Sequence, residues 1–168
     1  MGAWSGPPPL ENAVKITGRV KLFHFRRGSM VGYQSGRNLV VDSGRNLITD
    51  IIRTNNGSYP IPKYFAFGSG GGIIDASGLD LISELLNIPS GANRTTGTIS
   101  LLVLYELAFW ANVAKNAGAA DTVREIGIFN AAPHGPDSGT MLCRFLPQPF
   151  VMENGDNVLT YWALTFGD

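Results

Sequence analysis

Three short runs in the last third of the chain have the two-residue periodicity of β-strands, and they restrict the fold more than any other feature. In the final run, residues 158–166, one face would carry Val158, Trp162 and Leu164, and the intervening residues would form the other face. Neither face has an acidic or basic side chain. The earlier runs span residues 123–129 and 139–145. We therefore expect three strands held by packing, with Trp162 in the core.

Alternation and turn signals predict the other elements. Strands are expected at residues 14–22, 30–34, 38–42, 64–67 and 98–110, and short helices at residues 43–53, capped by Ser43, and 75–89. Seven or eight strands without βαβ alternation indicate a mainly β protein. The expected fold is a β-sandwich or jelly-roll-like domain over residues 13–168, with two short helices and an extended N-terminal arm.

The arm comprises residues 1–12. Three consecutive prolines favour a stiff polyproline conformation that projects outward. A partner or a neighbouring copy is expected to bind it through Trp4, Pro7, Pro8, Pro9 and Leu10.

Charge is distributed unevenly along a chain whose formal net charge is zero. Basic residues dominate residues 1–53, and acidic residues dominate the remainder. The two signs could pair within the fold, which we favour, or between copies. The first strand would expose a basic face made of Lys15, Arg19, Lys21, Arg26 and Arg27.

The aromatic and basic residues 23–27 could in principle stack on bases and neutralise phosphates. Two arginines in a net-neutral chain are weak support for nucleic-acid binding. We favour a solvated strand edge or contact with an acidic protein surface.

Residues suited to chemistry are sparse. His24 and His134 are far apart in the sequence, so a site formed by both is the weaker alternative. Residues 68–72 are glycine-rich, but no Lys-Ser/Thr follows as in a P-loop, and we expect glycines with positive φ there. We expect no enzymatic activity, metal or cofactor.

Acidic side chains leave one catalytic alternative open. Glu106, Asp121 and Glu125 could supply a carboxylate pair, although cross-strand ion pairs with Arg124 and Arg144 are favoured. Cys143 lies in an apolar run and is expected to be a buried, unreactive thiol.

Five segments in series resemble a group of small virion proteins of tailed bacteriophages. They are residues 38–47, 63–70, 124–130, 139–144 and 159–166, and the match in order and spacing extends from about residue 14 to the end. The resemblance implies a structural role without catalytic residues. In the segment 124–130 it implies an apolar strand whose Gly127 lies where another backbone passes closely. The resemblance extends to both head proteins and tail proteins of these phages, so it does not distinguish between the two locations.

The first functional hypothesis is a capsid decoration (cement) protein that binds the assembled outer shell and stabilises contacts between capsid subunits, which it bridges through its N-terminal arm. Its partners would be the major capsid protein and further copies of itself, in a homo-oligomer such as a trimer. The alternative is a tail or baseplate adaptor, or a host-binding protein, with tail proteins as partners. A third is a carbohydrate-binding or carbohydrate-active protein that uses Trp162 or Trp110 as a sugar platform and Glu106 in turnover.

The expected location is the virion, after synthesis in the host cytoplasm. The first ten residues lack the pattern of a secretory signal. The longest apolar stretch, residues 101–110, is too short to span a bilayer. We therefore expect no membrane partner.

Overall fold

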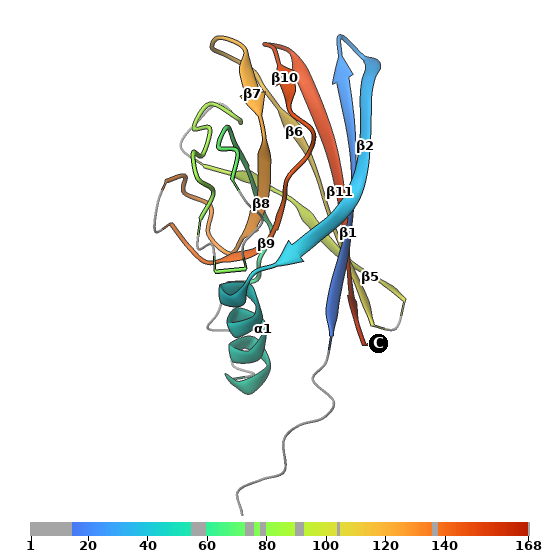
Figure 1. Ribbon diagram of the computed structural model, residues 1–168, viewed down its shortest axis with the longest axis vertical. Coiled ribbons are helices and arrows are strands. Elements are labelled where there is room, and N and C mark those ends of the chain that lie inside the picture. Colours follow the sequence, from blue (N-terminus) through green and yellow to red (C-terminus); the bar gives the residue numbers. More distant parts are fainter. Residues whose placement is uncertain are drawn as a thin grey trace, which may run out of the picture.

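One nine-stranded antiparallel sheet dominates the part of the chain that the structure describes (Figure 1). The computed structural model describes residues 15–54, 60–72, 76–77, 80–89, 93–103, 105–135 and 138–167. The strands of this sheet are β1 (Ile16–Arg26), β2 (Ser29–Val40), β3 (Tyr64–Gly68), β4 (Thr95–Thr96), β5 (Thr98–Val103), β6 (Glu106–Ala114), β8 (Glu125–Phe129), β9 (Met141–Phe145) and β11 (Asp156–Phe166). Their order across the sheet is β4-β3-β8-β9-β2-β1-β11-β6-β5. Two further strands, β7 (Asp121–Val123) and β10 (Phe150–Met152), form a small separate pair.

The two edges of the large sheet approach each other at Gly97. This residue alone separates β4 from β5, the first and last strands in the order. A Cβ there would lie 2.3 Å from the Phe65 ring and 2.8 Å from the Trp110 carbonyl oxygen, so only glycine fits. The sheet is therefore nearly closed, and the protein is mainly β, as predicted, with a sandwich-like or barrel-like fold.

The closing strand β11 lies between β1 and β6, and its predicted faces are confirmed. Val158, Trp162 and Leu164 are buried, whereas Thr165 on the opposite face is exposed. The Trp162 ring meets Phe65 and Phe145 edge-on, with centroid distances of 6.3 and 6.4 Å. Aromatic contacts of this geometry stabilise a core beyond the area they bury. Trp162 is thus a core residue.

The predicted helix at residues 43–53 is present as α1 (Asp42–Thr54). Ser43 was expected to cap it, but its hydroxyl donates to the Met141 carbonyl, 3.1 Å away, and so attaches the helix to β9. Gly44 packs directly on the same strand, because a Cβ there would lie 2.0 Å from the Leu142 carbonyl oxygen. The first turn is therefore held by contacts that the local sequence does not reveal.

The second predicted helix, residues 75–89, is wrong for the residues described in that range, 76–77 and 80–89. Residues 80–89 form turns beside β3 instead. The Leu85 amide donates to Phe67 at 2.7 Å, and the Ser69 amide donates to Ser83 at 2.8 Å. Leu85 also packs against the core. Pairing with β3 satisfies backbone hydrogen-bonding groups of this segment, so tertiary contacts override the helical preference that the spacing of the leucines indicates.

Several strands differ in length from their predictions, and more than the expected seven or eight occur. Residues 98–110 are a hairpin of β5 and β6 rather than one strand, and Tyr105 in its turn has φ of 74°. No glycine, asparagine or proline signals that turn. Residues 29–40 form one strand where two were expected, and Arg124 divides the run at 123–129 into β7 and β8.

The glycines of residues 68–72 were expected to have positive φ, and this is wrong for Gly68, Gly70, Gly71 and Gly72. At Gly70 and Gly72 a Cβ would lie 2.5 and 2.2 Å from Ile82, so these two make room for a side chain. Gly127 also faces side chains, with Phe129 and Met141 nearest, rather than a passing backbone.

Candidate partner-binding groove

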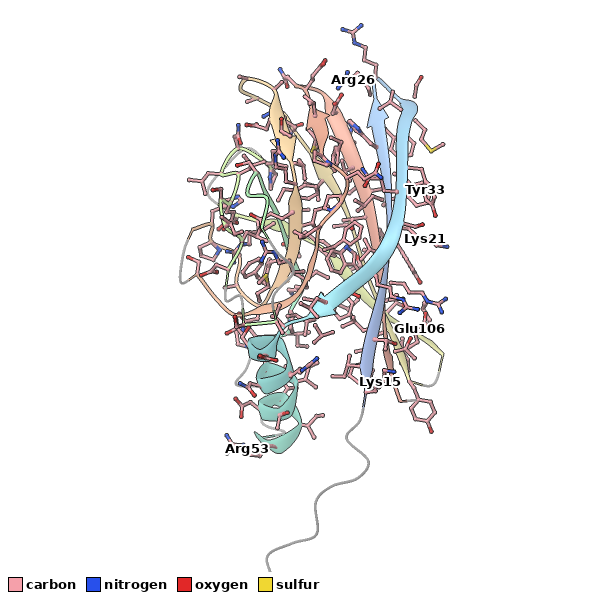
Figure 2. The ribbon with its side chains drawn as sticks, in the orientation of Figure 1. Lys15, Lys21, Arg26, Tyr33, Arg53 and Glu106 are labelled. Carbon is pink, nitrogen blue, oxygen red and sulfur yellow. The ribbon has the colours of Figure 1, made fainter. Side chains whose placement is uncertain are left out.

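The outward face of β1 is basic along its first half. Lys15, Arg19 and Lys21 are exposed. Val20 and Leu22, which alternate with them along the strand, are buried. Figure 2 shows Lys21 on the outer side of the β1–β2 hairpin and Lys15 where β1 begins. The strand alternation thus directs three of the five predicted basic residues to solvent.

A groove opens where β1 and β2 separate. Their pairing ends at Gly18 and Asn38, after which β1 continues beside β11 and β2 turns to pair with β9. Figure 1 shows this bend of β2 toward α1. The groove has a volume of about 280 Å³, and its basic lining residues are Lys15, Arg19, Arg37 and Arg45. We call it the basic groove. Arg37 and Arg45 were not among the predicted site residues.

Positive charge in the basic groove is largely unneutralised. Arg19 and Arg37 are directly opposite in the β1–β2 register. Like charges in this position destabilise a strand pair. Among the described residues, no carboxylate forms an ion pair with either arginine, and Arg45 contacts Asp42 at 3.3 Å on the exposed surface. Guanidinium groups favour paired hydrogen bonds to carboxylates and phosphates, so the groove is suited to an acidic group.

Arg26, predicted to share the basic face, is half-buried and belongs to an ion-pair network around a buried carboxylate instead. Its Nε lies 3.0 Å from Oδ1 of Asp156, a residue only 1% exposed. His24 Nε2 lies 2.9 Å from Oδ2 of the same carboxylate, and the Glu153 amide donates to it at 2.9 Å. Arg26 lies directly opposite Asp156 in the β1–β11 register, which places its guanidinium on this carboxylate. Arg27 is exposed in the following turn with φ of 50°.

The Asp156 carboxylate is held in its charged form. Burial alone would raise its pKa, but hydrogen bonds from Arg26, the Glu153 amide and His24 outweigh burial and hold the pKa well below its ordinary value. This network ties β1 to the turn before β11. It accounts for part of the predicted pairing between the basic and acidic parts of the chain.

A second buried cluster surrounds Glu84. Arg94, which is 2% exposed, donates from Nε and Nη2 to the two oxygens of Glu84, both at 2.8 Å. His134 Nδ1 lies 2.7 Å from Glu84 Oε1. Burial would raise the pKa of Glu84, but hydrogen bonds from Arg94, the Gly135 amide and His134 lower it on balance. Sequence reasoning missed Glu84 and Arg94, because neither lies in a recognisable motif.

The Arg94 guanidinium also lies 3.7 Å from the centre of the Phe129 ring. A planar cation stacked on an aromatic face and bonded to a carboxylate is well suited to burial. His24 and His134 therefore serve separate clusters and do not form the two-histidine site considered above.

The three carboxylates considered for catalysis are also separate. Glu125 forms the predicted cross-strand ion pair with Arg144, and Asp121 pairs with the fully buried Lys115. Glu106 lies toward the lower part of the sheet in Figure 2, above Lys15, at the start of β6. Within the described residues, no group of three or more histidine, cysteine or acidic residues could hold a metal ion.

Cys143 is fully buried, as predicted, and burial raises the pKa of its thiol well above the ordinary value. Trp162 is also fully buried, so the prediction of a sugar platform there is wrong. Trp110 is 43% exposed and lies opposite Tyr161 on the outer face, where that hypothesis stays a prediction.

The predicted arm contacts Trp4, Pro7, Pro8, Pro9 and Leu10 lie outside the described residues.

None of the helices in the described ranges is long and apolar enough to cross a membrane. Comparisons with protein-family models, curated proteins and solved structures found no match.

Proposed function

We propose that the chain is a non-enzymatic structural protein of a bacteriophage virion, a jelly-roll-like capsid decoration protein that binds the assembled outer shell. The observation that carries the binding part is the Arg19–Arg37 pair in the basic groove, which has no acidic partner in the described residues. The placement in a virion rests on the resemblance of the five sequence segments.

In this proposal an acidic side chain or loop of the major capsid protein enters the basic groove. It would offset the repulsion between Arg19 and Arg37 and gain charge-assisted hydrogen bonds. A protein that binds the closed shell better than free subunits stabilises the shell by mass action. Copies seated across subunit boundaries would thereby strengthen those boundaries.

The alternative is a tail or baseplate adaptor or host-binding protein, and copy number separates it from the first. A decoration protein follows the symmetry of the shell, so its copy number is comparable with that of the major shell protein. A tail protein is present at a small multiple set by the tail axis. Quantitative gel densitometry of purified particles measures the ratio.

The groove is tested by binding full-length protein to particles from which it has been stripped. Arg19→Glu and Arg37→Glu should each weaken binding at low salt by about tenfold or more and reduce its salt dependence. Arg124→Glu is the matched control, because Arg124 is exposed and lies outside the groove lining. It should leave binding unchanged.

Equal binding by the groove variants and the Arg124→Glu control would contradict a role for the groove. Particles that never contain the chain would contradict the virion assignment itself. Competition by a single-stranded oligonucleotide, lost in the groove variants but not in the control, would reassign the groove to nucleic acid.

A further inference from the structure

An apolar pocket lies between α1 and the strands β5, β6 and β11. It has a volume of about 290 Å³ and no polar lining. Its walls include Ile48 and Ile51 of the helix and Leu107, Leu164 and Phe166 of the strands. An engineered cavity of about 150 Å³ binds benzene, so this one can accept a larger ring system.

The rim of the pocket is also apolar and unusually exposed. Ile52 is 74% exposed and Ile61 is 60% exposed, and both contribute to the lining. Leu101 shares the alternating face of Ile99, another lining residue, and is 67% exposed. Apolar side chains gathered around an open pocket indicate a site that another apolar segment covers.

The chain itself contains a segment of the required chemistry. Residues 1–14 include Trp4, three prolines, Leu10 and Val14, and Glu11 is their only charged side chain. This segment leads into the sheet beside the pocket, because the Gly167 amide donates to the Lys15 carbonyl at 2.9 Å and Phe166 lines the pocket. The point at which the arm begins therefore lies beside the pocket.

The same placement favours insertion into another copy. Trp4 precedes Lys15 by eleven residues. At about 3.1 Å per residue in polyproline, it can extend roughly 30 Å from the point where the arm begins. Entry of Trp4 into the adjacent pocket would need a reversal of chain direction between Trp4 and Lys15, and three consecutive prolines at residues 7–9 disfavour a reversal. Reaching out to a second copy needs no reversal.

We propose that this pocket binds the N-terminal arm of a second copy of the chain, with Trp4 as the anchor, and that arm exchange assembles the protein into its oligomer. A buried aromatic anchor contributes a disproportionate share of an interface. The contact needs only residues of this chain, so it stands independently of the virion assignment.

The first test measures self-association of the full-length chain by sedimentation velocity over a concentration series. Trp4→Ala and Ile52→Glu should each weaken association by about thirtyfold. Ile52 is mostly exposed, so a charge there should disturb the pocket without unfolding the protein. Met30→Glu is the matched control, because Met30 is 59% exposed on β2 and outside the pocket lining.

The second test separates exchange between copies from insertion within one copy. Trp4→Ala protein keeps an intact pocket, and Ile52→Glu protein keeps an intact arm. Mixing the two should restore a dimer, because one arm–pocket contact can then form between them. A mixture that stays monomeric while wild type associates would overturn the exchange.

A wild-type protein that stays monomeric at all concentrations would also overturn it. Association that Trp4→Ala leaves unchanged would overturn it as well.

Fluorescence in a Trp110→Phe background provides an independent readout, because Trp162 is already buried in the core. Emission from Trp4 should shift to shorter wavelength as the concentration rises, and Ile52→Glu should abolish that shift.

Discussion

Arginine has opposite roles in two regions of this molecule. In the two ion-pair clusters, Arg94 and Arg26 each hold a carboxylate that is largely buried. In the basic groove, Arg19 and Arg37 face each other without an acid among the described residues. For the two arginines of β1, strand position decides the difference, because Arg26 lies directly opposite Asp156 of β11 whereas Arg19 lies opposite Arg37 of β2. The role of an arginine in this protein therefore depends on whether the fold places a carboxylate beside it.

The strongest test of the structural side of this comparison is Arg94→Ala. The substitution leaves the Glu84 carboxylate buried without its two hydrogen bonds from arginine. Breaking one partner of a buried ion pair costs about 3–5 kcal/mol of unfolding free energy. Urea denaturation measures the loss. Arg124→Ala, at an exposed position, should stay within about 0.5 kcal/mol of wild type. A loss below about 1 kcal/mol in Arg94→Ala would mean that the cluster does not support the fold.

Asp156→Asn tests the other cluster and should lower the unfolding free energy by about 2 kcal/mol at neutral pH. The pKa of Asp156 is lower in the folded than in the unfolded protein. Its stabilisation is therefore complete above the ordinary value near ~4 and is lost as the pH falls below it.

The stability curves of wild type and Asp156→Asn should accordingly converge under acid conditions. Glu84, whose pKa is also lowered, titrates in both proteins, so its contribution cancels in the difference between the curves. Glu153→Gln is the control, because it removes only the exposed ion pair between Glu153 and Arg26, which should change stability little. Parallel curves down to the lowest pH would contradict the assignment.

The periodic parts of the fold could be predicted from the sequence. The faces of β11, the position of α1 and the burial of Cys143 follow from local pattern. The helix expected at residues 75–89 could not be excluded from the sequence, because only the hydrogen bonds to β3 make the turn conformation more favourable than a helix. The hairpin turn at Tyr105 could not be predicted either, since the residues before it are apolar and the segment contains no turn signal.

The candidate site could be predicted only in part. Alternation identifies Lys15, Arg19 and Lys21 as an outward basic row, but Arg37 joins it through cross-strand register. Arg45 joins because the chain turns from β2 directly into α1. The Glu84–Arg94–His134 cluster combines three segments whose proximity exists only in the folded protein.

The smallest effect is the most informative, because its sign differs from that of the substitutions above. Arg37→Gln removes the like charge opposite Arg19 and should raise the unfolding free energy by roughly 0.2–1 kcal/mol at low salt. High salt should reduce the gain, since the repulsion is between exposed groups. Ser35→Gln, on the same exposed face of β2, is the control.

The same Arg37→Gln protein should bind its partner more weakly. A gain in stability together with a loss of binding would mean that the fold tolerates the Arg19–Arg37 repulsion for the sake of a ligand. If the substitution instead lowers stability, Arg37 supports the fold. The groove would then belong with the buried clusters, and the difference between the two regions would disappear.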